Sequence, residues 1–217
     1  MREFIMYSRK GATSSDFNLK DLPGSGGRMD LNARCVISAL WLSRDMRRDS
    51  RMVFSLNGPP EAPLAMAFDG KELERVTPDE RNIGLWIKKV LDRKEEIGDE
   101  WKEVHDGIYL SKKSFQDLIK ERSERNLYVL HESGEDIRSV DIKEDPVFVL
   151  GSFPIKFILY ECYGVCAEIA FRAKRDLSAT KSFNKFLFFF WKSYMIPQHK
   201  NRVLLYVYGP YIFTTFM

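Results

Sequence analysis

Two short apolar segments place the strongest constraint on the fold of this chain. Residues 127–131 read Leu-Tyr-Val-Leu-His, and residues 146–151 read Pro-Val-Phe-Val-Leu-Gly. Such nearly continuous hydrophobicity is typical of strands that are buried on both faces of a parallel sheet. Three more strands are predicted over residues 3–7, 51–57 and 63–69. Because helical segments alternate with these strands, the sequence predicts a layered α/β domain with a mainly parallel sheet.

Three helices are predicted between the strands. The first begins near Asp30, a natural N-cap, and its apolar face is formed by Leu31, Cys35, Ala39, Leu42 and Met46. The second begins at Thr77, whose hydroxyl is expected to cap the helix. Pro78 then occupies the first helical position, and Glu80 reaches back to the cap. The third helix is predicted over residues 114–125.

The composition of the chain changes after Gly151. Residues 151–217 hold 9 of the 34 lysines and arginines but only 3 of the 31 acidic residues. They also hold 17 of the 29 aromatic residues. The net charge of the whole chain, +3, by itself says little about a polyanionic partner. We therefore divide the chain into a main domain, residues 1–151, and a basic, aromatic-rich tail, residues 152–217.

Cysteine usage and apolar runs bear on the compartment of the protein. Cys35, Cys162 and Cys166 are an odd set without zinc-ligand spacing, so neither a disulfide framework nor a metal site is expected. The amino terminus lacks the apolar stretch of a signal peptide. The apolar runs 186–191 and 203–217 are shorter than the roughly 20 residues of a membrane span. The sequence thus predicts a cytoplasmic protein with no membrane span.

The loop before the first helix is a candidate phosphate-binding segment. Residues 21–30 read Asp-Leu-Pro-Gly-Ser-Gly-Gly-Arg-Met-Asp, which combines flexible glycines, Arg28 and a helix start. These features suit an anion such as an RNA phosphate, although a glycine-rich loop is more often a simple turn. The segment is not a Walker A loop, because the Lys-Ser/Thr pair is missing.

Two further groups of residues have both a functional and a structural interpretation. Arg47 and Arg48 follow the first helix and could contact an RNA backbone, or they could neutralise the last carbonyl groups of that helix. Asp79 and Arg81 lie in the first turn of the second helix. A carboxylate there could accept a proton and an arginine could bind a phosphate, but acidic residues also stabilise first turns electrostatically.

Several segments together resemble the archaeal tRNA (pseudouridine(54)-N1)-methyltransferase family, which belongs to the knotted SPOUT class. They include the stretch from Thr13 to Leu31, Leu-Asn-Gly-Pro-Pro from Leu56, and Thr-Pro-Asp-Glu-Arg-Asn from Thr77. Two more are Leu-His-Glu-Ser-Gly-Glu-Asp from residue 130 and the strand 146–151. Their order and spacing cover about two-thirds of the chain.

The resemblance implies a homodimer that binds the T-loop of tRNA and transfers a methyl group from S-adenosylmethionine to N1 of a pseudouridine. Asp79 matches the family segment from which we expect the proton acceptor. Leu130 and Gly151 match positions that touch the cofactor, which lies in a carboxy-terminal trefoil knot. The residues expected to bind RNA are Arg28, Arg34, Arg47, Arg48 and Arg81.

The resemblance ends at Gly151. The family pattern continues with Asp-His, whereas this chain continues with Ser-Phe-Pro. A shift of reading frame in the gene would explain this departure, and a genuine divergent tail is the other interpretation. Two functional classes follow: a methyltransferase whose tail completes the cofactor pocket, and a catalytically silent tRNA-binding remnant.

Overall fold

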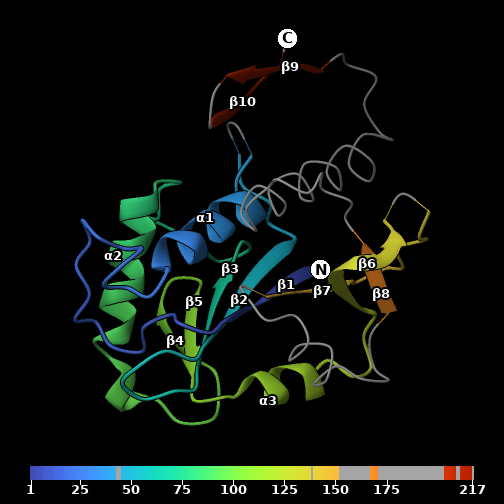
Figure 1. The fold of residues 1–217 in the computed structure, drawn as a ribbon. Coiled ribbons are helices and arrows are strands. Elements are labelled where there is room, and N and C mark those ends of the chain that lie inside the picture. Colours follow the sequence, from blue (N-terminus) through green and yellow to red (C-terminus); the bar gives the residue numbers. More distant parts are fainter. Residues whose placement is uncertain (43–44, 138, 152–166, 171–202, 209–210, 217) are drawn as a thin grey trace.

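A computed structural model describes residues 1–42, 45–137, 139–151, 167–170, 203–208 and 211–216 (Figure 1). Its main feature is an eight-stranded sheet with the strand order β4-β5-β3-β2-β1-β7-β6-β8. The strands of this sheet are β1 (Arg2–Ser8), β2 (Ser50–Leu56), β3 (Leu64–Asp69), β4 (Lys102–His105), β5 (Ile108–Ser111), β6 (Leu127–Asp136), β7 (Val147–Gly151) and β8 (Ala167–Ala170). The predicted α/β class is therefore confirmed.

Strand β1 lies in the middle of the sheet and pairs in parallel on both sides. Its partners are β2, with Ile5 opposite Val53, and β7, with Ile5 opposite Val149. Strand β6 is also parallel to β7 and to β8. The other side of the sheet is antiparallel, because β3 reverses after β2 and pairs in turn with β5.

Strands β4 and β5 form a hairpin that the sequence does not predict. The turn between them contains Gly107, whose φ of 73° lies in the left-handed region that glycine adopts without steric cost. Strand β4 is short and its residues are half-buried or exposed. Because it contributes little to the core, it lacks the apolar alternation by which strands are found in sequence.

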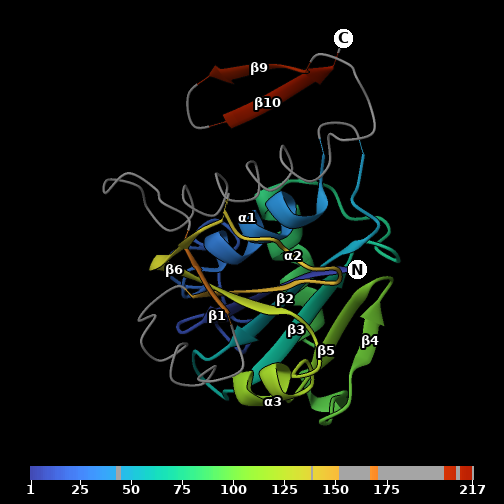
Figure 2. The same ribbon diagram turned by 90° about the vertical axis from the view of Figure 1, so that its right-hand side faces the viewer.

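Helices cover both faces of the sheet. Helices α1 (Met29–Leu40) and α2 (Glu80–Leu91) lie on one face, and α3 (Phe115–Lys120) lies on the other (Figures 1 and 2). The core is divided accordingly. Phe4, Phe54, Phe68 and Phe148 point to the α1 and α2 side, and Phe115 of α3 fills the other.

The start and end of α1 differ from the prediction. Its N-cap is Arg28 rather than Asp30, and Arg28 has left-handed backbone dihedrals, φ 74° and ψ 31°. The helix ends at Leu40, so Leu42 and Met46 do not extend its apolar face. The chain leaves the helix there, because Trp41 is extended and forms a β-bridge with Met46.

Helix α2 begins two residues later than predicted. Its N-cap is Asp79, whose carboxylate accepts hydrogen bonds from the backbone N–H groups of Arg81 and Asn82. The prediction that Thr77 caps this helix is therefore wrong. Instead, the backbone N–H of Thr77 donates to Asn82 Oδ1, 3.0 Å away. A carboxylate accepts two donors at once more effectively than a hydroxyl, which explains why Asp79 displaces the threonine.

The remaining elements extend the prediction. Helix α3 is shorter than expected and begins with a capping box between Ser114 and Asp117. Strand β6 continues beyond residue 131 to Asp136. In the tail, β8 pairs with β6, and β9 (Val203–Tyr208) pairs with β10 (Tyr211–Phe216) in an antiparallel ribbon. The expected trefoil knot would involve residues that lie largely outside the described part of the chain.

Candidate functional site

The carboxyl ends of the central parallel strands form one edge of the sheet. There, Tyr7 of β1 is opposite Gly151 of β7, and Ser8 is opposite Leu56 of β2. Helix α1 begins at the same edge, since the Asn32 side chain donates to Ser8 Oγ over 3.2 Å. Open α/β sheets bind their ligands at such an edge, so it is the first place to seek a site.

Three loops interlock at this edge in an arrangement that we call the glycine clasp, formed by Lys10, Gly11, Gly27 and Gly58. A Cβ atom on Gly27 would lie 1.7 Å from the carbonyl oxygen of Lys10, and one on Gly58 would lie 2.4 Å from it. The backbone N–H of Gly58 donates to the carbonyl of Gly11 at 2.9 Å. The loops after β1 and β2 are thereby fixed against the loop that leads into α1.

Asp30 in the first turn of α1 is buried between two arginines. Its side chain is 6% exposed. Its Oδ2 accepts a hydrogen bond from Arg28 Nη2 at 3.2 Å and a shorter one from Arg34 Nη2, while Arg28 Nε lies 3.2 Å from Oδ1. Arg34 Nε also donates to the backbone carbonyl of Asp30 at 3.2 Å. One carboxylate therefore holds two of the arginines that the sequence predicts as RNA ligands.

The first turn of α2 meets this group. Arg34 Nε lies 3.8 Å from Glu80 Oε2, which joins the two helix starts. Partial burial raises the pKa of Glu80, and the charges of Asp30 and Asp79 raise it further against the opposing effect of Arg34. Arg81 is exposed beside them. The structure thus brings together Arg28, Arg34, Asp79 and Arg81, which are distant in sequence.

Arg47 and Arg48 lie elsewhere. Arg47 Nη1 donates to the carbonyls of Ser38, Ala39 and Trp41 at 2.8–3.3 Å, at the carboxyl end of α1. Burial lowers the pKa of Arg47 to about 10, and the charge of Arg2 contributes to the decrease. Arg48 donates to the carbonyl of Gly70 at 3.1 Å. The contacts of Arg47 agree with the structural alternative, whereas Arg48 contacts the loop after β3 rather than the end of α1. A role of either residue in RNA binding stays a prediction.

Leu130 and Gly151 lie on neighbouring strands. Strands β6 and β7 are paired up to Val129 and Val149, so each residue follows the paired stretch toward the carboxyl edge. Leu130 is half-buried and packs on the core of the α1 and α2 side. Gly151 has no side chain and is likewise only partly buried. The two positions offer apolar surface and accessible backbone where the pairing of β6 with β7 ends.

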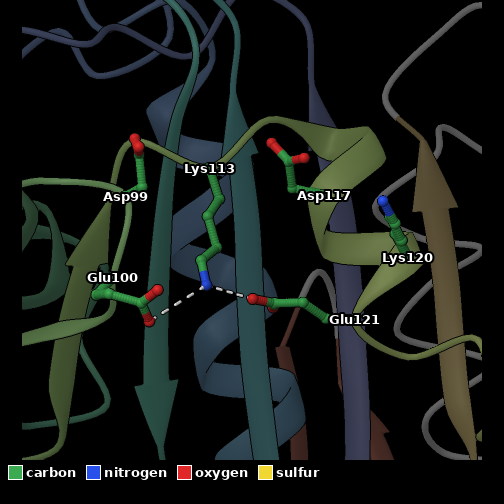
Figure 3. A pocket seen from close by; sticks show the side chains of 6 residues that line it. All are labelled: Asp99, Glu100, Lys113, Asp117, Lys120 and Glu121. Carbon is green, nitrogen blue, oxygen red and sulfur yellow. Dashed lines mark hydrogen bonds and ion pairs between the residues drawn. The ribbon is translucent and has the colours of Figure 1, made fainter.

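A concave region lies beside α3, on the face of the sheet that this helix covers (Figure 3). It is a cavity of about 590 Å³ lined by Asp99, Glu100, Lys113, Asp117, Lys120 and Glu121. Lys113 forms an ion pair with Glu121 and lies 3.9 Å from Glu100. Because its central cation is already paired and no apolar side chain lines it, we assign this cavity no function.

Sequence reasoning missed Asp30 and Glu80 as parts of the site. The sequence predicts Asp30 only as the cap of the first helix, and Glu80 only as the partner of Thr77 in a capping box of the second. A signal was present, because Asp30 and Arg34 have the i, i+4 spacing of an ion pair on one helix face. The contact of Arg34 with Glu80 depends on how two helices pack, and no local pattern reports it.

Among the described residues, no helix is both long and apolar enough to cross a membrane. That part of the chain also contains no cluster of three or more residues able to hold a metal ion.

Comparison with known proteins relates the chain to a family. The family described as "Putative SAM-dependent RNA methyltransferase" matches residues 1–155. The tRNA (pseudouridine(54)-N(1))-methyltransferase of Methanocaldococcus jannaschii is 49% identical over 157 residues, which cover 70% of this chain and 76% of the relative. The enzyme of the same name from Thermococcus kodakarensis is 41% identical over 155 residues, covering 70% and 78%.

A solved structure has a related fold. The crystal structure of Archaeoglobus fulgidus Nep1 bound to S-adenosylhomocysteine superposes with a TM-score of 0.57 and 11% identity, covering 88% of this chain and 96% of that one. This likeness confirms the SPOUT-like fold that the sequence predicts. Together with the sequence matches, it leads to one assignment: the chain belongs to the family of SAM-dependent RNA methyltransferases that contains the archaeal tRNA (pseudouridine(54)-N1)-methyltransferases.

Proposed function

We propose that this protein transfers a methyl group from S-adenosylmethionine to N1 of pseudouridine 54 in the T-loop of tRNA. The observation that carries the proposal is the convergence of Arg28, Arg34, Arg81 and Asp79 at the starts of α1 and α2. The start of α1 lies at the carboxyl edge of the central parallel strands, where open α/β sheets bind their ligands. Cations there can bind RNA phosphates, and a carboxylate can take up a proton.

The chemistry requires a proton acceptor. S-adenosylmethionine supplies an electrophilic methyl group on a sulfonium. Pseudouridine is joined to ribose through carbon, so its N1 carries a proton that must leave as the N–C bond forms. Both hydrogen bonds that cap α2 use Oδ1 of Asp79, 3.0 and 2.9 Å from the donors. The Oδ2 atom of this exposed side chain is then available to accept the N1 proton.

The cofactor would lie where the pairing of β6 with β7 ends. Leu130 would contact its apolar part, and Gly151 would let the ligand approach the backbone, because no Cβ intervenes. Their partial burial just beyond the paired stretch of β6 and β7 fits this role. The remainder of the pocket would come from the residues that follow Gly151, in accordance with the division into a main domain, 1–151, and a tail, 152–217.

The arginines would fix the position of the tRNA. Arg28 and Arg81 are exposed and Arg34 is half-buried, so all three present donors at the surface. Phosphate contacts position a nucleic acid without reading its sequence. Recognition of pseudouridine would instead come from its N1–H group, whose proton the carboxylate of Asp79 accepts.

A methyl-transfer assay tests the proposal. The full chain is incubated with S-adenosylmethionine labelled in the methyl group and with two tRNAs that differ only in pseudouridine or uridine at position 54. We expect label in the pseudouridine tRNA only, because N1 of uridine is bonded to ribose and carries no proton. Equal labelling of both tRNAs, or of neither, would contradict the proposal.

Calorimetry separates the enzyme from the catalytically silent alternative. Saturable binding of S-adenosylmethionine is expected of the enzyme, whereas a remnant would bind tRNA without the cofactor. The family match extends through residue 155, across the break at Gly151, and favours the enzyme.

We also propose that the protein acts in the cytoplasm, where tRNA is available, and that it is a homodimer, as the family resemblance implies. Light scattering at several protein concentrations gives the mass of the particle. A particle with the mass of one 25.4 kDa chain at all concentrations would contradict the dimer.

A further inference from the structure

We infer that Asp30 is a positioning residue for RNA binding, which holds Arg28 and Arg34 as a preformed two-arginine clamp for phosphate. This inference rests on the proposed function, because it concerns how the same edge of the sheet would bind tRNA. It assigns a role to a carboxylate that would otherwise oppose binding of a polyanion.

The burial of Asp30 is the first support. Its side chain is 6% exposed, whereas the side chains of Arg28 and Arg34 are 53% and 37% exposed. Its Oδ1 atom is fully buried and accepts no hydrogen bond among the described residues. Asp30 therefore does not face the RNA itself. A buried carboxylate is tolerated when cations compensate it, and the two arginines provide this compensation.

The geometry of the arginines is the second support. Each uses only some of its five N–H donors on Asp30: Arg28 donates through Nη2, and Arg34 donates through Nη2 to the carboxylate and through Nε to the backbone. An arginine fork can hold a carboxylate on one side and present its remaining donors to a phosphate on the other. A lysine has no fixed fork and would not combine the two contacts.

The backbone supplies the third support. Arg28 has φ 74°, a left-handed conformation that is uncommon for a residue with a side chain. The loop holds this conformation, since the N–H of Arg28 donates to the carbonyl of Pro23 at 3.1 Å and that of Met29 to the carbonyl of Leu22 at 3.1 Å. The left-handed residue turns the Arg28 side chain back over the helix start, where it reaches the carboxylate of Asp30.

Preformed side chains matter because ordering a flexible arginine on binding opposes association. Two arginines that are already held avoid this loss, which for two side chains corresponds to at least about fivefold in affinity. The clamp thus binds RNA more tightly because its two arginines are already ordered, although Asp30 lowers the local positive charge.

Two charge-matched variants test the role of Asp30. Asp30→Asn and Asp45→Asn each raise the net charge by one, and Asp45 is exposed beyond the opposite end of α1. A purely Coulombic effect would tighten binding of tRNA in both. We expect Asp30→Asn to weaken binding of a pseudouridine-54 tRNA at least about fivefold, with Asp45→Asn unchanged or slightly tighter. Equal affinities of the two variants would overturn the inference.

A third comparison excludes a merely structural role. In an Arg28→Gln, Arg34→Gln background, Asp30 has no arginine left to position, so adding Asp30→Asn is expected to change the tRNA affinity no further. If Asp30→Asn weakens binding as much in this background as in the unaltered chain, it acts through the fold and the inference fails.

The unaltered chain provides a test that does not depend on a variant that folds poorly. NMR measures hydrogen exchange of arginine Nε–H groups in the absence of RNA, with Arg34→Lys used to assign one signal. We expect slow exchange for Arg34, whose Nε donates to the backbone carbonyl of Asp30 while its Nη2 donates to the carboxylate, and fast exchange for the exposed Arg81. Equally fast exchange would overturn the inference. If the chain binds no tRNA, the proposed function fails, while this measurement still decides whether Arg34 is held in place at the start of α1 without RNA.

Discussion

Glu3 and Arg122 face each other in a buried ion pair with two hydrogen bonds. Arg122 Nε donates to Glu3 Oε2 at 2.8 Å and Nη2 donates to Oε1 at 2.7 Å. Arg125 Nη1 adds a third bond to Oε2 at 2.6 Å. The pair joins the central strand to the turn after α3, across 119 residues of sequence.

Loss of one member of this pair should destabilise the protein strongly. We expect Arg122→Ala to lower the free energy of unfolding by about 3–5 kcal/mol, because it leaves the Glu3 carboxylate buried without its main partner. Urea denaturation followed by circular dichroism measures the change. The double variant Glu3→Leu, Arg122→Met is expected to recover much of the loss, and a double variant no more stable than Arg122→Ala would contradict this explanation.

The same pair predicts sensitivity to acid. Burial alone would raise the pKa of Glu3, but the hydrogen bonds and charge of Arg122, together with Arg51 and Arg125, lower it overall. The folded state thus releases this proton more readily than the unfolded state. The stabilisation is complete above the ordinary glutamate pKa and is lost as the pH falls below it.

Urea denaturation between pH 3 and pH 7 measures the effect. We expect the free energy of unfolding to decrease more steeply with acid in the unaltered chain than in Glu3→Gln. Parallel curves for the two proteins would show that Glu3 does not contribute to the pH dependence.

Asp79 can be tested without loss of its helix cap. Asparagine caps helices about as well as aspartate, so Asp79→Asn should retain stability and cofactor affinity, while methyl transfer falls by about 10²–10⁴-fold. Asp79→Ala should lose transfer and also about 1 kcal/mol of stability. Turnover by Asp79→Asn at the unaltered rate would exclude this residue as the proton acceptor.

Arg47 and Arg81 should show opposite effects. Arg47→Gln removes donors from the carbonyls at the end of α1, so we expect a lower melting temperature and nearly unchanged tRNA affinity. Arg81→Gln should retain the melting temperature and weaken tRNA binding. The slope of the logarithm of tRNA affinity against the logarithm of salt concentration should also become shallower by about 1, which corresponds to one phosphate contact. The reverse pattern would assign RNA binding to Arg47.

Much of this site follows from local patterns, and the rest depends on packing. The buried strands, the α/β class and the candidates Asp79 and Arg81 are predictable because periodicity and helix starts are local. The role of Asp30 is harder to predict from the sequence, because burial of a carboxylate depends on the surrounding loops. The β4–β5 hairpin escapes prediction since an edge strand needs little hydrophobic pattern.

Because of the glycine clasp, we expect the protein to tolerate alanine at some glycine positions and not at others. Gly58→Ala would place its Cβ 2.4 Å from one backbone oxygen and 2.6 Å from another, so the loops must move apart. Gly98→Ala meets no atom within 4 Å and serves as the control. We expect thermal melting to show a large loss for Gly58→Ala and little change for Gly98→Ala. Similar melting temperatures would show that the three loops are not rigidly interlocked.

The central place of β1 has a consequence for synthesis of the protein. One edge of β1 is filled by β2 once residue 56 is available, but the other edge waits for residues 147–151 of β7. A nascent chain must therefore carry an unpaired edge rich in apolar residues while some 90 further residues are translated. Exposed strand edges pair with other chains. The ribosome and its associated chaperones would have to shield this strand for most of the time that the domain takes to emerge.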